Sequence, residues 1–199
     1  NNFLIIAAVD CTGHGVPGAF MSMLGTSFLN ETVTKTKFDK PNEILERLRK
    51  KVKISLKQTG KDIEQRDGMD MALCILDLDN KEMQYAGAYN PLYLIRNGEL
   101  IEYKADRQPV AIHYVEKEFT NHVIKLQEGD ALYIFSDGFY DQLGGTKYKK
   151  FLSKNFKSLL LEINKKSMEQ QKDLLDKTLK EWMKDYEQID DILVIGIRV

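Results

Sequence analysis

The sequence lacks most of the features that mark secreted, nucleic-acid-binding or membrane-spanning proteins. Its two cysteines, Cys11 and Cys74, are too few for a disulfide framework and have no metal-type spacing, which favours a reduced, cytoplasmic context. The formal net charge is −1, so no excess of positive charge predicts binding to nucleic acid or to anionic lipid. The apolar runs are strand-sized, well below the roughly 20 residues that a membrane span needs, so no direct membrane contact is expected.

Neither a signal peptide nor an initiator methionine is present. The apolar stretch Phe3–Val9 begins two residues into the sequence, with no preceding turn or helix cap. Apolar and charged fractions of 43% and 30% are typical of a globular protein, and the length suits one domain. We therefore predict a single domain over residues 1–199 that is a piece of a longer chain and lacks its first strand or strands.

The residue pattern predicts a strand, two helices, a meander of strands, two further helices and a final strand. The helices are expected from Val16 to Thr34, from Pro41 to Gly60, over 151–163, and after a capping box at Ser167–Gln170. The strands are expected at 3–9 (buried), 71–78, 82–88, 92–96, 99–103, 119–126, 131–135 and 192–199. This order does not alternate strand and helix, so it favours an α+β fold with antiparallel sheet over a parallel sheet.

Three aspartates stand at the predicted strand ends. Asp10 closes the first strand, Asp137 follows the strand at 131–135, and Asp190 opens the last one. A carboxylate at the rim of a buried strand needs a hydrogen bond, an ion pair or a cation. Oxygen ligands without a matching set of histidines or cysteines favour Mg²⁺ or Mn²⁺. For each aspartate alone, capping of a turn is the favoured interpretation, but three together favour a cation site.

Four motifs in order carry a resemblance to a known family. The segment Asp10–Ala19 (DCTGHGVPGA) resembles the Asp-x-x-Gly-His-Gly segment of the SpoIIE-like branch of the PPM (type 2C) phosphatases. Tyr85–Leu92 resembles the Ala-Gly-x-x-Asn-Pro stretch of that branch, Ser136–Gly138 its Ser/Thr-Asp-Gly, and Asp190–Ile192 its closing Asp-Asp. The four motifs span nearly the whole chain, which makes the resemblance specific.

The resemblance implies a layered α-β-β-α sandwich, with two antiparallel sheets flanked by helices and a two-metal site between the sheets. In this family pattern Asp10 bridges both ions, the backbone carbonyl of Cys11 binds one, and Asp137 and Asp190 hold the other. Asp191 is the alternative to Asp190, and Gly138 belongs to the same motif as Asp137. The implied reaction is hydrolysis of phosphoserine or phosphothreonine by a metal-bound hydroxide, with Mn²⁺ or Mg²⁺.

The resemblance also implies a bacterial signalling role. The expected substrate is a phosphorylated anti-sigma-factor antagonist or a similar STAS-like protein. An upstream sensor domain, in a parent chain that is cytoplasmic or membrane-anchored, is expected to switch the activity, and a homodimer is one assembly that remains open. The helix predicted from Val16 to Thr34 follows Asp10 directly, so it is the expected transmitter to the metal site.

Several alternatives remain open from the sequence. His14 is a candidate general acid, although a local turn role is favoured, and Asp70 could reach the same cleft, although capping a turn is favoured. No segment matches a further acidic motif of the family, and Leu193 replaces its usual Thr or Ser; both motivate the alternative of a non-catalytic regulatory module. Finally, Gly13–Gly18 matches the G-x-G-x-x-G pattern of dinucleotide-binding domains.

Overall fold

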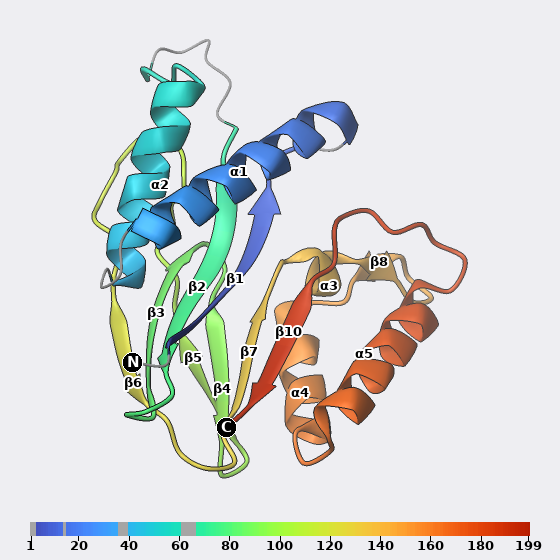
Figure 1. Ribbon diagram of the computed structural model, residues 1–199. Helices are drawn as coiled ribbons and strands as arrows, with labels where there is room; N and C mark the ends of the chain where they lie inside the picture. The colour runs from blue at the N-terminus through green and yellow to red at the C-terminus, as the bar shows by residue number, and fades with distance from the viewer. Residues whose placement is uncertain (1–2, 14, 36–39, 61–66) are drawn as a thin grey trace. The chain divides into compact units, whose positions relative to one another are not determined.

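The chain folds into two compact units, each built on one four-stranded antiparallel sheet. The structure, a computed structural model, describes residues 3–13, 15–35, 40–60 and 67–199 (Figure 1). The first unit comprises Asn1–Pro91 and Lys104–Leu126, and the second comprises Leu92–Tyr103 and Gln127–Val199. No helix of the described residues combines the length and the apolar character needed to cross a membrane.

The sheet of the first unit has the strand order β1-β2-β3-β6. These strands are β1 (Phe3–Cys11), β2 (Met69–Asp77), β3 (Glu82–Ala88) and β6 (His122–Lys125), and the helices are α1 (Gly15–Lys35) and α2 (Pro41–Ser55). The helices pack on the sheet through a core that includes Ile44, Leu45 and Leu48 of α2 and Met71 and Leu73 of β2. These α2 residues recur at helical spacing, which explains why one face of the helix is buried.

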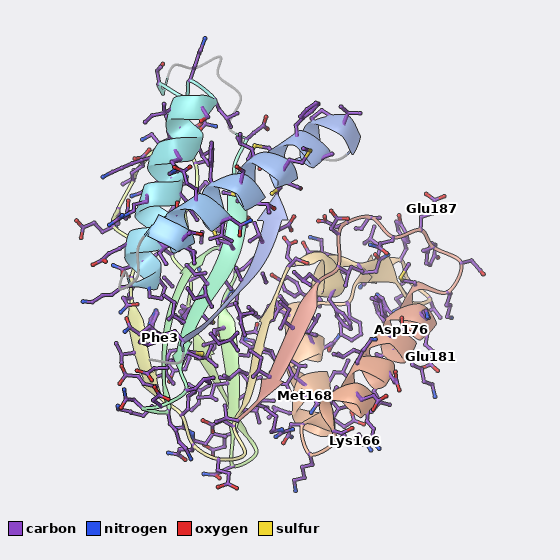
Figure 2. All side chains as sticks on the ribbon, viewed as in Figure 1. Phe3, Lys166, Met168, Asp176, Glu181 and Glu187 are labelled. Atoms are coloured by element: carbon purple, nitrogen blue, oxygen red, sulfur yellow. The ribbon has the colours of Figure 1, made fainter. Side chains whose placement is uncertain are left out.

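Two expectations for the first unit were wrong. The first strand was expected to be buried, but Phe3 and Leu4 are 43% and 44% exposed; Figure 2 labels Phe3 on this strand. Among the described residues β1 lies at the edge of its sheet, next to β2. Helix α2 was expected to stop at Gly60 but ends at Ser55. The left-handed residue that follows the helix is Lys57, with φ of +52°, and the amide of Gln58 donates back to Lys53 (2.8 Å).

The sheet of the second unit has the order β10-β7-β4-β5, and all its strand pairs are antiparallel. Its elements are β4 (Leu92–Arg96), β5 (Glu99–Tyr103), β7 (Ala131–Phe135), α3 (Gly138–Asp141), the short pair β8 (Leu143–Gly144) and β9 (Lys149–Lys150), α4 (Ser153–Ile163), α5 (Met168–Met183) and β10 (Val194–Arg198). Aromatic side chains dominate its core: Phe135 of β7 lies edge-on to Phe156 of α4, with ring centroids 5.0 Å apart.

Local signals explain several of these elements. The Asn97-Gly98 turn has positive φ at both residues, as a two-residue hairpin requires, and joins β4 to β5. The capping box predicted at Ser167 is confirmed: its hydroxyl accepts from the amide of Gln170, whose side chain accepts from the amide of Ser167. Asp176, labelled in Figure 2, lies on the exposed face of α5. It forms an ion pair with Lys180 one turn away.

The predicted α+β class with antiparallel sheets is confirmed. Between β1 and β2 the chain forms two consecutive helices, and β2 returns antiparallel to β1. A dinucleotide-binding fold needs a parallel strand after one crossover helix. The dinucleotide-binding alternative for Gly13–Gly18 is therefore wrong.

Candidate metal centre

In the first unit, Asp10 is the eighth of nine residues in β1 and lies directly opposite Asp70 of β2. Residues directly opposite one another in an antiparallel pair have side chains on the same face of the sheet, so the two carboxylates share one face. Both residues are half-buried. The interpretation of Asp70 as a turn-capping residue was wrong, because it lies inside a strand.

The turn after β1 is tied down by backbone and hydroxyl contacts. The Thr12 amide donates to the carbonyl of Gly68 (3.0 Å), and the Gly68 amide donates to the Thr12 hydroxyl (3.2 Å). A Cβ on Gly18, in the first turn of α1, would lie 2.5 Å from the carbonyl oxygen of Gly13, so only glycine allows this close approach. Cys11, the last residue of β1, is half-buried, and His14 lies outside the described residues.

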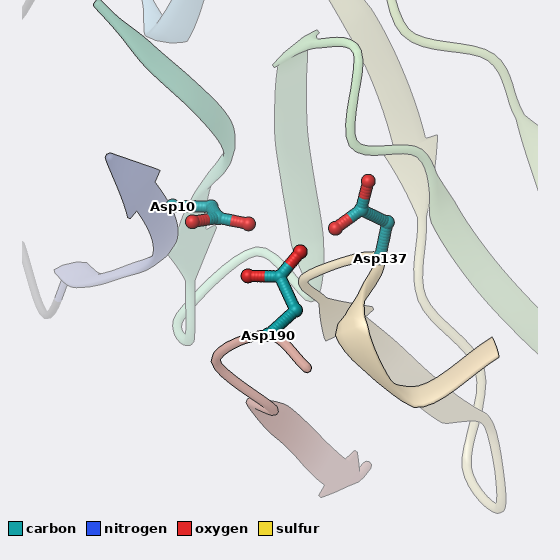
Figure 3. A group of neighbouring side chains, drawn as sticks. All are labelled: Asp10, Asp137 and Asp190. Carbon is teal, nitrogen blue, oxygen red and sulfur yellow. The ribbon is translucent and has the colours of Figure 1, made fainter. Parts of the chain in front are cut away.

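In the second unit, Asp137 and Asp190 form a close carboxylate pair. Asp137 is half-buried and precedes the first residue of α3, whereas Asp190 is exposed in the chain before β10. One carboxylate oxygen of each lies within 4.8 Å of the other, and Figure 3 shows the two groups pointing toward one another. The third aspartate labelled in that figure, Asp10, belongs to the first unit.

The electrostatics of this pair are unfavourable without a counter-charge. Burial raises the pKa of Asp137 above its usual value, and the negative charges of Asp190 and Asp141 raise it further. Two carboxylates that repel one another are stabilised by a divalent cation between them. The donor set consists of oxygen atoms and therefore fits a hard cation such as Mg²⁺ or Mn²⁺.

The structure corrects the placement of Asp190. Its strand begins only at Val194, so Asp190 lies in an irregular loop rather than at a strand start. The backbone carbonyl of Asp191 accepts a hydrogen bond from the Ser136 hydroxyl (2.8 Å). Gly138 is the first residue of α3, and a Cβ there would lie 2.3 Å from that same carbonyl oxygen. The short α3 was not predicted, because four residues carry no periodic signal.

Comparison with protein-family models shows which family this chain belongs to. The sequence model described as Stage II sporulation protein E (SpoIIE) matches residues 2–199. The chain belongs to the SpoIIE family. As a SpoIIE-family member it is homologous to PP2C-type serine/threonine phosphatase domains, which are metal-dependent hydrolases of the PPM group. Comparison with curated proteins finds no match.

Solved structures show the same fold for this SpoIIE-family chain. The SiaA-PP2C domain of Pseudomonas aeruginosa is 28% identical with a TM-score of 0.87, and the match covers 98% of this chain and 75% of that one. The PP2C phosphatase domain of SpoIIE from Bacillus subtilis, with a fragment of its regulatory domain, is 19% identical with a TM-score of 0.72. The RsbU and RsbW domains of Rv1364c from Mycobacterium tuberculosis are 21% identical with a TM-score of 0.72.

The matches differ in how much of each relative they span. This chain covers 54% of the Bacillus subtilis structure and 51% of the Mycobacterium tuberculosis one, while 98% of this chain is covered in both cases. The chain therefore spans about half the length of these two relatives. The PP2C-type phosphatase fold expected from the motifs is confirmed.

Proposed function

We propose that this domain hydrolyses phosphoserine or phosphothreonine on a signalling protein, using two Mn²⁺ or Mg²⁺ ions. The proposal assigns Asp137 and Asp190 to one ion, Asp10 to a position between the two ions, and the backbone carbonyl of Cys11 to the other ion. The observation that carries it is the Asp137–Asp190 pair, whose oxygens lie within 4.8 Å of one another, and in which burial first and the charge of Asp190 second raise the pKa of Asp137.

Each residue has a simple role in this proposal. Bound divalent cations would lower the pKa of the attacking water and offset charge on the phosphoryl oxygens. Asp137 and Asp190 would hold one cation, and the turn held by Thr12 and Gly68 fixes the main-chain carbonyl of Cys11, which would hold the other. A magnesium complex of RsbX, a relative in fold with 15% identity and a TM-score of 0.64, supports the choice of a hard cation.

The substrate proposal is narrower than the family assignment. We propose a phosphorylated anti-sigma-factor antagonist or a related STAS-like protein, acted on in the cytoplasm, with an upstream sensor domain controlling the activity. The occurrence of an RsbU domain beside an RsbW domain in the Mycobacterium tuberculosis relative, and of a regulatory domain in SpoIIE from Bacillus subtilis, supports a regulatory setting.

Hydrolysis of p-nitrophenyl phosphate tests the proposal. We expect Mn²⁺-dependent turnover in the 199-residue chain, lost on addition of a chelator and abolished in Asp137→Asn. The control is Asp173→Asn, which removes an equal charge from an exposed position on α5 and is expected to behave as the original chain. No turnover and no calorimetric heat of Mn²⁺ binding in a folded chain would favour a non-catalytic regulatory module. Turnover that survives Asp137→Asn would refute the assigned site.

A further inference from the structure

The loop that carries Asp190 has no regular secondary structure. We call the residues Glu187–Leu193 the Asp190 loop; they lie between the end of α5 and the start of β10. Backbone amides and carbonyls that are not in a helix or sheet need partners from side chains or water. The partners of this loop therefore determine where the Asp190 carboxylate lies.

Gln142 holds the N-terminal half of the Asp190 loop. This residue follows α3, and it is fully buried at 0% exposure. Its side-chain carbonyl accepts a hydrogen bond from the Ile189 amide (3.3 Å), and its side-chain NH₂ donates to the backbone carbonyl of Glu187 (2.9 Å). Gln142 thus satisfies one donor and one acceptor of the loop at the same time.

Ser136 holds the C-terminal half of the loop in the same way. It is 3% exposed, and its hydroxyl donates to the carbonyl of Asp191 (2.8 Å) and accepts from the amide of Leu193 (3.0 Å). Its own amide donates to the Leu193 carbonyl (3.0 Å). The loop approaches so closely here that a Cβ on Gly138 would collide with the carbonyl of Asp191.

These contacts place Asp190 between two anchors that come from the same seven residues as Asp137. We propose that Ser136 and Gln142 are positioning residues that set the separation of the Asp137 and Asp190 carboxylates, and thereby the affinity for the cation. The inference rests on the proposed metal-dependent function. Each side chain would act on the cation site through the loop backbone, as outer hydrogen-bonding partners of metal ligands do.

Two measurements on the 199-residue chain test the inference. Amide hydrogen exchange of Ile189 and Leu193 reports directly on the anchors, and calorimetric titration with Mn²⁺ reports the consequence. We expect Ser136→Ala to speed exchange at Leu193 and Gln142→Met to speed it at Ile189. Each variant should weaken Mn²⁺ binding about 10–100-fold, the range typical for such partners. Ser136→Thr retains the hydroxyl and should restore both readouts.

Gln171→Met is the matched control. Gln171 is also a buried glutamine of the second unit, at 2% exposure, and its side-chain NH₂ also donates to two backbone carbonyls, those of Asn164 and Lys166. It makes no contact with the Asp190 loop among the hydrogen bonds of the described residues. We expect Gln171→Met to lower the free energy of unfolding as Gln142→Met does, while Mn²⁺ affinity stays unchanged.

The outcomes separate this inference from the proposed function. Mn²⁺ affinity that falls equally in Gln171→Met and Gln142→Met would overturn the inference, because the effect would then reflect general destabilisation. Unchanged exchange at Ile189 and Leu193 in the anchor variants would overturn it directly. If the original chain binds no Mn²⁺ while the exchange rates respond as expected, the proposed function fails and the claim on cation affinity fails with it; the anchoring itself then stands.

Discussion

Asp137→Asn is expected to stabilise the metal-free protein while it destroys the metal response. The substitution removes a half-buried carboxylate whose pKa is raised first by burial and then by Asp190 and Asp141. At 4.8 Å, the upper limit of the separation of their oxygens, two unit charges repel by about 1 kcal/mol at the dielectric constant of water and by about 3.5 kcal/mol at an effective constant of 20. Because Asp190 is exposed, we expect a gain near the lower figure, about 1 kcal/mol.

The pH dependence of this gain has a definite sign. A carboxyl group whose folded pKa is raised destabilises the fold when it is ionised and does so no longer once it is protonated. The advantage of Asp137→Asn should therefore be present at neutral pH and shrink as the pH falls through the raised pKa of Asp137. Below the ordinary aspartate value, near pH 3.9, the two proteins should differ little.

Urea unfolding at pH 7, with chelator and then with saturating Mn²⁺, measures both effects. In chelator the variant should have the higher midpoint. With Mn²⁺ at about 100 times its dissociation constant the original chain should gain about 2.7 kcal/mol and the variant should gain little, so the order reverses. A variant that is less stable than the original chain in chelator, or one that gains equally from Mn²⁺, would refute the reasoning.

Three further predictions concern other parts of the fold. Asp130→Asn should lower the free energy of unfolding at pH 7, measured in urea, by about 3 kcal/mol, because it leaves Arg96 without the carboxylate that it binds through two nitrogens. Burial tends to raise the pKa of Asp130, but hydrogen bonds from Arg96 and the Gln127 amide lower it overall. The stabilisation by Asp130 should therefore be lost as the pH falls below about 4. Burial raises the pKa of the Cys74 thiol to about 12, so it should resist a thiol reagent at pH 8 until the chain unfolds. Gly18→Ala should displace the turn after β1 and weaken Mn²⁺ binding as measured by calorimetry. Unchanged affinity would show that α1 does not influence the metal site.

The sequence predicted those elements whose signals are local. Residues 82–88, 92–96, 99–103 and 131–135 were expected as strands and are strands with those bounds. Alternating or continuous apolar runs, together with the turn at Asn97, are enough to define them. The capping box at Ser167 is equally local, since its donors and acceptors lie within three residues.

The predictions from the sequence fail where contacts between residues far apart in the chain determine the structure. The apolar run of β1 looks like a buried strand, but its burial depends on its place in the sheet and on what packs against its faces; among the described strands it lies at the sheet edge, next to β2. Helix α2 ends early because Gln58 is held by contacts remote in sequence: its side chain accepts from the Ile112 amide (3.0 Å) and donates to the Asp67 carbonyl (2.6 Å). Gly60, from which the end of the helix was predicted, carries no information about those partners.

The candidate metal centre depends both on a motif that is visible in the sequence and on contacts that are visible only in the structure. The Ser136–Asp137–Gly138 motif was visible in the sequence, yet its meaning as a unit comes from the structure. Asp137 supplies a carboxylate, the Ser136 hydroxyl holds the Asp190 loop, and the absence of a side chain on Gly138 lets that loop approach. Gln142, five residues after Asp137, completes the support but carries no sequence signal of its own, because a buried glutamine can be recognised only from the backbone groups that it satisfies. A motif search therefore identifies the carboxylates of such a site. The residues that fix the separation of these carboxylates are found only when the hydrogen-bond partners of the irregular loop backbone are identified.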